Sequence, residues 1–85
     1  MKTVSCEIVT PEKVYLREEA EFVVAPGYSG ELGILPGHTR LLAQLSPGNV
    51  RLVKGKESRQ FVISAGFIYI EPTSIKIFTP VIRPV

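Results

Sequence analysis

The chain has 85 residues, a formal net charge of +2, 45% hydrophobic residues and 21% charged residues. This length allows one domain with a modest core, and the balance of apolar and charged residues is that of a folded globular protein rather than a disordered one. The small net charge, with basic residues scattered along the chain, argues against a dedicated nucleic-acid-binding domain.

The first part of the chain alternates apolar and polar residues with the two-residue period of a β-strand. In residues 2–9 the inward-facing side chains are those of Val4, Cys6 and Ile8. Residues 13–17 are expected to form a second strand, with Val14 and Leu16 facing inward and Tyr15 facing outward. The pattern therefore predicts two short, half-buried strands near the N-terminus.

Glu18 and Glu19 form a candidate charged turn, after which Ala20, Phe22 and Val24 alternate with glutamates as in a third strand. A helix over residues 12–22 remains an alternative, because the glutamate-rich centre of that stretch is compatible with a helix. The alternation favours strands.

Residues 26–45 are the stretch around which the rest of the chain is organised. Four glycines and two prolines between residues 26 and 37 predict a series of turns around a short extended piece, residues 31–35. The apolar side chains expected to be buried are Leu32, Ile34, Leu35, Leu41, Leu42 and Leu45. Such a loop suits presentation to a partner, although a plain connection between two sheets also explains its composition. Residues 39–45 fit either a strand or a single helical turn.

The second half of the chain repeats short strand signals separated by turn residues. A strong turn at residues 46–49 is followed by two predicted strands, residues 50–54 and 59–64, around a hairpin tip at Gly55 and Lys56. Phe61 and Ile63 are expected on one face of the second of these strands.

Residues 67–71 are apolar on both faces, which predicts a central strand. In the strand expected over residues 75–78, Ile75 and Ile77 face inward. Pro80 and Pro84 predict an extended arm at the end rather than a helix. In total the pattern predicts eight to ten short antiparallel strands, arranged as two packed sheets or a flattened barrel.

No combination of residues in the sequence points to catalysis or to a cofactor. His38 is the only histidine, and no motif places a nucleophile beside it. The eight glutamates alternate with inward apolar groups, as on solvated faces. Gly27, Gly30 and Gly33 recur every three residues, but neither a Gly-Lys-Ser/Thr motif nor a helix follows them, so no nucleotide site is expected. With one cysteine, Cys6, there is neither an internal disulfide nor the ligand set of a protein-only zinc site.

The sequence also contains no apolar run of about 20 residues and no signal-peptide pattern, so a reducing, cytoplasmic compartment is expected. An interaction module is then the preferred functional class. Its candidate surface comprises Tyr28, Glu31, Leu32, His38 and Arg40. The alternative is a small β-barrel that binds single-stranded nucleic acid, which would need aromatic stacking platforms in a basic groove. The candidate platforms are Tyr15, Tyr28 and Tyr69.

The string Gly-Glu-Leu-Gly-Ile-Leu-Pro-Gly-His at residues 30–38, followed by Leu-Leu at 41–42 and Pro-Gly at 47–48, resembles the ε subunit of the bacterial F-type ATP synthase. In mitochondria the equivalent subunit is called δ. Supporting matches are Glu-Ile-Val-Thr-Pro-Glu at residues 7–12, Val-Arg at 50–51 and Ser-Ala-Gly-Phe at 64–67. The resemblance covers essentially the whole chain.

This resemblance implies that residues 1–85 form an all-β domain, a flattened β-barrel of ten strands in two sheets. It implies a noncatalytic subunit of the central stalk, or rotor, which binds the γ subunit and the ring of c subunits and so couples ion translocation to ATP synthesis. The subunit would be peripheral to the cytoplasmic face of the bacterial inner membrane, held there through the complex without direct insertion. No cofactor and no nucleic-acid partner are implied.

The resemblance also assigns contact residues. The implied contacts with the c ring are Ser29, Glu31, Leu32 and Gly33. The implied contacts with the γ subunit are Thr10, His38, Leu42 and Ala43.

Two departures from the family pattern bear on these expectations. The family usually continues into a helical hairpin, which inhibits ATP hydrolysis in long members and binds ATP in some, whereas this sequence ends at Val85. Both hairpin functions are therefore expected to be missing from this polypeptide, whether the hairpin is naturally absent or was truncated. Arg40 stands where the family often has proline or a small residue, so the detail of that surface should differ.

Overall fold

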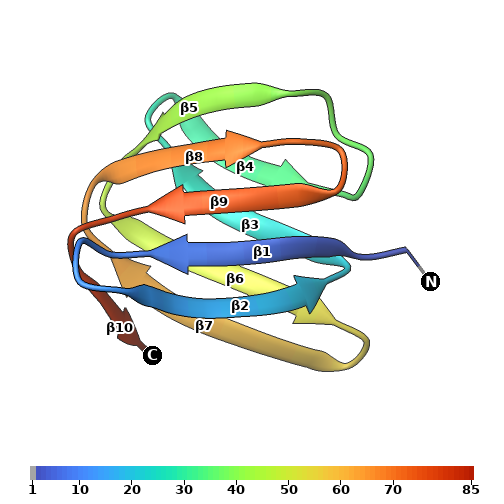
Figure 1. Ribbon diagram of the computed structural model, residues 1–85, viewed down its shortest axis with the longest axis horizontal. Coiled ribbons are helices and arrows are strands. Elements are labelled where there is room, and N and C mark those ends of the chain that lie inside the picture. The colour runs from blue at the N-terminus through green and yellow to red at the C-terminus, as the bar shows by residue number, and fades with distance from the viewer. Residues whose placement is uncertain (1) are drawn as a thin grey trace.

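The computed structural model describes residues 2–85, which form an all-β fold of ten strands (Figure 1). The strands are β1 (Val4–Val9), β2 (Val14–Ala20), β3 (Phe22–Gly27), β4 (Gly30–Ile34), β5 (Leu41–Leu45), β6 (Gly48–Lys54), β7 (Glu57–Ile63), β8 (Gly66–Ile70), β9 (Ser74–Phe78) and β10 (Ile82–Pro84). The helical alternative for residues 12–22 is wrong, and the segment before Leu45 is a strand rather than a helical turn.

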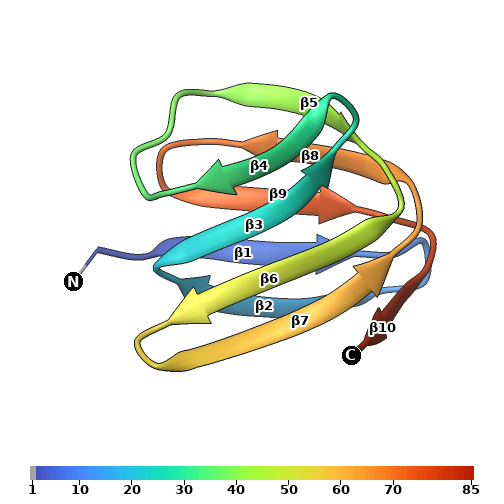
Figure 2. The ribbon, with the colours of Figure 1, turned by 180° about the vertical axis from the view of Figure 1, so that it is seen from behind.

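The strands form one continuous hydrogen-bonded sheet in the order β10-β7-β6-β3-β5-β8-β9-β1-β2, with β4 paired to β3. This sheet curls over on itself, so that β5, β8, β9, β1 and β2 form one layer and β4, β3, β6, β7 and β10 form the other (Figures 1 and 2). The layers are continuous where Gly27 on β3 pairs with Leu45 on β5. The expected flattened barrel of two packed sheets is confirmed.

Side chains close the opposite side of the barrel, where β2 faces β7. Arg59 on β7 forms an ion pair with Glu18 on β2. The Tyr15 ring meets the Phe61 ring edge to face, with their centroids 5.9 Å apart at an interplanar angle of 87°. The Arg59 guanidinium also lies over the Phe61 ring, 5.3 Å from its centroid. These contacts replace the backbone pairing that joins the layers on the other side.

The core between the layers is built from the inward residues of nearly every strand. Its members are Val4, Cys6, Ile8, Ala20, Val23, Ala25, Ile34, Leu45, Val50, Leu52, Phe61, Ile63, Ile68, Ile70, Ile75 and Ile77. Most of the β-branched residues predicted to face inward are among them, as their fit to a pleated, half-buried surface leads one to expect. Within residues 2–85 no buried side-chain polar atom lacks a hydrogen-bond partner.

Leu16 packs against the core as predicted, but the predicted orientations of Val14 and Tyr15 are wrong because of a β-bulge. Ile8 pairs with Leu16 and Val9 pairs with Val14, so Tyr15 is an extra residue without a partner on β1. A bulge of this kind reverses the alternation of faces across it. Val14 is consequently 46% exposed, whereas Tyr15 packs against the core. The predicted turn at Glu18 and Glu19 is also wrong, because β2 continues through both residues.

Two further expectations require correction. The strands are not all antiparallel, since β1 and β9 pair in parallel although they lie at opposite ends of the sequence. Of the six apolar residues of the central stretch that were expected to be buried, only Ile34 and Leu45 are fully so. Leu35, Leu41 and Leu42 are exposed, because they lie on the edge or the outer face of the barrel.

The turn predicted at residues 46–49 is shorter than expected, because β6 already begins at Gly48, whereas the other elements agree with the sequence pattern. Lys54 pairs with Glu57 across a two-residue hairpin whose first residue, Gly55, has a φ of 61°. β8 lies between β5 and β9, as expected of a central strand. The C-terminal arm is extended and pairs with β7 as β10. No helix capable of spanning a membrane is present in residues 2–85.

Candidate partner-binding surfaces

The four residues expected to touch the c ring all lie on the β3–β4 hairpin. Gly27 pairs with Gly30 to close this hairpin, and a Cβ at Gly27 would lie 2.4 Å from the Gly30 carbonyl oxygen, so only glycine fits there. The hairpin is tied to β5 because the backbone N–H of Tyr28 donates to the Gln44 carbonyl at 2.8 Å. The tip is therefore a rigid projection rather than a free loop.

A groove of about 420 Å³ runs between this hairpin and β5. It is lined by Gly27, Tyr28, Ser29, Gly30, Glu31, Leu32, Ala43 and Gln44. Ser29 and Glu31 are exposed, whereas Leu32 is half-buried and packs against the core. Gly33 lies outside the groove, beneath the Phe22 ring, where an added Cβ would come within 3.2 Å of that ring. Three of the four predicted residues thus share one concave, mainly apolar surface.

The four residues expected to touch the γ subunit do not form one cluster. Leu42 is exposed on the outer face of β5, whereas its neighbour Ala43 points the other way, packs against the core and lines the hairpin groove. Thr10 follows the end of β1, and its hydroxyl donates to the Lys13 carbonyl at 3.2 Å. His38 lies between β4 and β5, beyond the opposite end of the same layer.

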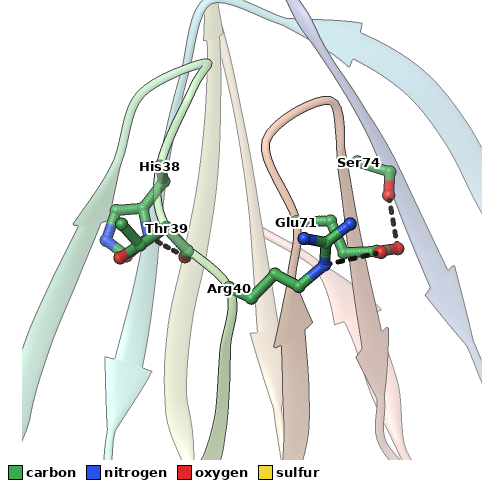
Figure 3. A network of polar contacts seen from close by, with 5 residues as sticks. All are labelled: His38, Thr39, Arg40, Glu71 and Ser74. Atoms are coloured by element: carbon green, nitrogen blue, oxygen red, sulfur yellow. Dashed lines mark hydrogen bonds and ion pairs between the residues drawn. The ribbon is translucent and has the colours of Figure 1, made fainter.

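The His38 ring is held by the backbone of the next residue. Its Nδ1 lies 2.6 Å from the carbonyl oxygen of Thr39 (Figure 3). Since a carbonyl can only accept, Nδ1 carries the proton in this contact, which leaves Nε2 of the neutral ring as an acceptor. Such a ring can receive a hydrogen bond from a partner through Nε2.

An exposed apolar strip on the outer face of β5, β8 and β9 was not foreseen as a site. Leu42, Phe67 and Phe78 are 68%, 53% and 43% exposed. Gln44 pairs with Phe67, which in turn pairs with Phe78, so these three residues form one row across the strands. Leu42 lies in the next row, where it pairs with Tyr69, which pairs with Lys76. The sequence signal was present, because Phe67 and Phe78 alternate out of phase with the buried isoleucines beside them.

A second groove, of about 460 Å³, lies beside this strip. It is lined by Val9, Thr10, Pro11, Gln44, Ala65, Gly66, Phe67, Phe78, Thr79 and Pro80. None of these residues carries a charge, and Thr10, one of the predicted γ contacts, is among them. Gln44 lines both grooves, so the hairpin surface and the apolar strip meet at this residue.

The segment that carries His38 is attached to the β8–β9 turn by polar contacts (Figure 3). Arg40 forms an ion pair with Glu71, with 3.4 Å between Nε and Oε2. Ser74 donates to the other oxygen of the same carboxylate at 3.3 Å. In residues 2–85 no group of three metal-ligating side chains is placed to hold an ion.

The sequence matches the family described as the β-sandwich domain of the ATP synthase delta/epsilon chain over residues 3–84. Two relatives are both named ATP synthase epsilon chain: one from Bordetella avium is 39% identical over 80 residues, and one from Desulforamulus reducens is 46% identical over 74 residues. These alignments cover 93% and 87% of this chain but only 57% and 56% of the relatives. The chain therefore spans little more than half the length of the curated relatives that it matches.

Solved structures show the same fold. A chain of the Euglena gracilis mitochondrial ATP synthase, solved with OSCP, F1 and the c-ring, matches with a TM-score of 0.91 and 25% identity over 99% of this chain and 54% of its own length. A chain of the Tetrahymena thermophila mitochondrial ATP synthase central stalk and c-ring matches with a TM-score of 0.77 at 18% identity, covering 98% of this chain and 69% of its own. The match over nearly the whole domain confirms the predicted family: this chain belongs to the β-sandwich domains of the ATP synthase delta/epsilon chain.

Proposed function

We propose that this domain is a noncatalytic part of the central stalk of an F-type ATP synthase, where it binds the γ subunit and the c ring. The observation that carries the proposal is the exposed apolar strip on β5, β8 and β9 together with the uncharged groove beside it, since an exposed apolar surface of this kind marks a protein interface. The resemblance to the ε subunit also implies that the domain lies at the cytoplasmic face of the membrane, held there by the complex without insertion.

We assign the γ subunit to the outer face of β5, β8 and β9. Thr10 and Leu42 flank this face, and Phe67 and Phe78 lie between them. Large aromatic side chains in a water-excluding patch typically supply most of an interface's binding free energy. Ala43 faces the core side, so its contribution would be through packing of β5, and His38 would lie at the margin of the interface.

We assign the c ring to the tip of the β3–β4 hairpin. Glu31 is exposed there and is suited to pair with basic groups on the polar loops of the ring, while Ser29 offers a hydroxyl. Because the turn glycines and the bond to Gln44 already fix the hairpin, little conformational entropy would be lost on binding. A stiff two-layer barrel that is bound by one partner at each surface can transmit torque between them without deforming.

The geometry does not favour the nucleic-acid alternative. Tyr15 packs against Phe61 where β2 faces β7 instead of offering a stacking face. Tyr28 is 72% exposed, but the groove that it lines carries Glu31 and no basic residue. Arg17, Arg40 and Arg59 are each engaged by a glutamate.

The γ assignment is tested by co-purification with the γ subunit of the source organism. Phe67→Ser should weaken binding by about tenfold or more, because it removes a central aromatic anchor. The matched control is Val62→Ser, which removes an apolar side chain that is 39% exposed on the other layer. Equal binding by Phe67→Ser and the unaltered protein would refute this surface.

The c-ring assignment predicts that Glu31→Lys leaves the isolated fold intact but weakens association of the γ complex with the c ring. The cause is replacement of an attractive charge by a repulsive one, so the defect should shrink as salt is added. Glu57→Lys, at the exposed β6–β7 hairpin, is the charge-matched control. Assembly of Glu31→Lys at the level of this control would show that the hairpin is not the contact.

A further inference from the structure

We propose that Glu71, in the β8–β9 turn, is a positioning residue that fixes the His38 segment through Arg40. The inference rests on the proposed function in one respect, namely that the His38 segment takes part in binding γ. The contact between Arg40 and Glu71, called the tether below, is itself a property of the isolated domain.

The anchor side of this tether is well held. The Glu71 carboxylate accepts from the Ser74 hydroxyl at 3.3 Å through Oε1, which leaves Oε2 directed at Arg40 (Figure 3). The backbone of Glu71 is also fixed, because its N–H donates to the Ser74 carbonyl at 2.8 Å. The Glu71 side chain is 32% exposed, so its position is more restricted than that of a fully exposed glutamate.

The segment between β4 and β5 is attached to the same turn at two points on either side of His38. The Gly37 N–H donates to the carbonyl of Pro72 at 2.8 Å, and Arg40 reaches Glu71 with 3.4 Å between Nε and Oε2. The His38 N–H additionally donates to the Leu35 carbonyl at 3.2 Å. His38 is thus bracketed by contacts to a turn that belongs to the β8–β9 hairpin, whose outer face carries the apolar strip.

The expected size of the effect is modest. The Arg40 side chain is 69% exposed, and ion pairs at such sites change a local equilibrium by about two- to fivefold. The interaction should also be screened by salt, because both charges are accessible to ions. A positioning role of this size alters the orientation of the segment without affecting whether the barrel folds.

The test measures hydrogen exchange of the Gly37 and His38 amides by NMR in the isolated protein at low salt. Arg40→Met and Glu71→Gln should each raise exchange at these amides by about two- to fivefold, and the double variant should exchange no faster than either single one. The charge-swapped pair, Arg40→Glu with Glu71→Arg, should restore part of the protection. Arg83→Met, which removes an exposed arginine on β10, is the control.

Unchanged exchange, or additive effects in the double variant, would overturn the tether. Binding of the same variants to γ is measured separately. Faster exchange with unaltered γ affinity would support the tether and contradict the role of His38 in γ binding. Weaker γ binding without faster exchange would contradict the tether, and would indicate direct contact by Arg40 or Glu71.

Discussion

Among single residues, Cys6 shows how burial in the core changes the acidity of a side chain. It has no exposed surface and lies among the apolar residues between the layers. Burial raises the pKa of its thiol from 9.0 to about 12, and the nearby charge of Glu7 adds to the effect. The thiol therefore behaves as a small hydrophobe, as its apolar neighbours at two-residue spacing predicted.

This pKa predicts how stability depends on pH. Because the folded-state pKa lies above the unfolded one, the unfolded chain loses the proton first, so the contribution is intact below pH 9 and is lost as pH rises toward 12. Above pH 9 the unaltered protein should lose roughly 1.4 kcal/mol more per pH unit than Cys6→Ala. Urea unfolding of both proteins from pH 8 to 10.5 measures this, and parallel pH profiles would contradict it.

At the scale of elements, the bulge in β2 decides which residues close the barrel. It turns Tyr15 toward Phe61 and Val14 toward solvent, the reverse of the alternation in the sequence. Two side-chain contacts cross the side of the barrel where β2 faces β7, called the seam here. They are the ring contact between Tyr15 and Phe61 and the ion pair between Glu18 and Arg59. The seam should accordingly respond to changes at Tyr15 and not to changes at Val14.

Tyr15→Ala is expected to lower the free energy of unfolding by about 2 kcal/mol or more, through lost burial and the lost edge-to-face contact. Val14→Ala, one residue away and largely exposed, should cost less than about 1 kcal/mol. Chemical denaturation of the two variants compares them directly. If Val14→Ala proved the more damaging, the bulge would be misplaced and the simple alternation would be right.

Local pattern predicted those elements whose periodicity is regular. Ile75 and Ile77 are buried as expected, and the turn at Gly55 forms as expected, because each depends only on neighbours in sequence. The bulge at Tyr15 and the parallel pairing of β1 with β9 depend on residues far apart in the chain, so alternation could not reveal them.

The two candidate surfaces also differ in whether local sequence alone could predict them. The hairpin was identified from its glycines and from a specific motif, whereas the strip at Phe67 and Phe78 needed the strand order to bring the two residues together. The pattern predicts that Leu42 is buried with the other leucines of the central stretch, whereas the resemblance assigns it to the γ contact. The structure places it outside, beside that strip.

At the scale of the whole molecule, the barrel presents two different surfaces on a single stiff body. The hairpin groove and the apolar strip meet at Gln44. β6 and β7 belong to the other layer (Figure 2), and none of their residues lines either groove. The proposed stalk function would use this adjacency, because torque would then pass between two partners through a short, well-packed path.

The decisive measurement for the proposed γ-binding face is hydrogen exchange of the domain with and without the γ subunit. We expect slowed exchange on binding in β5, β8 and β9, around the strip formed by Leu42, Phe67 and Phe78. Little change is expected in the β6–β7 hairpin. Protection confined to β6 and β7, or no protection anywhere at saturating γ, would contradict this assignment.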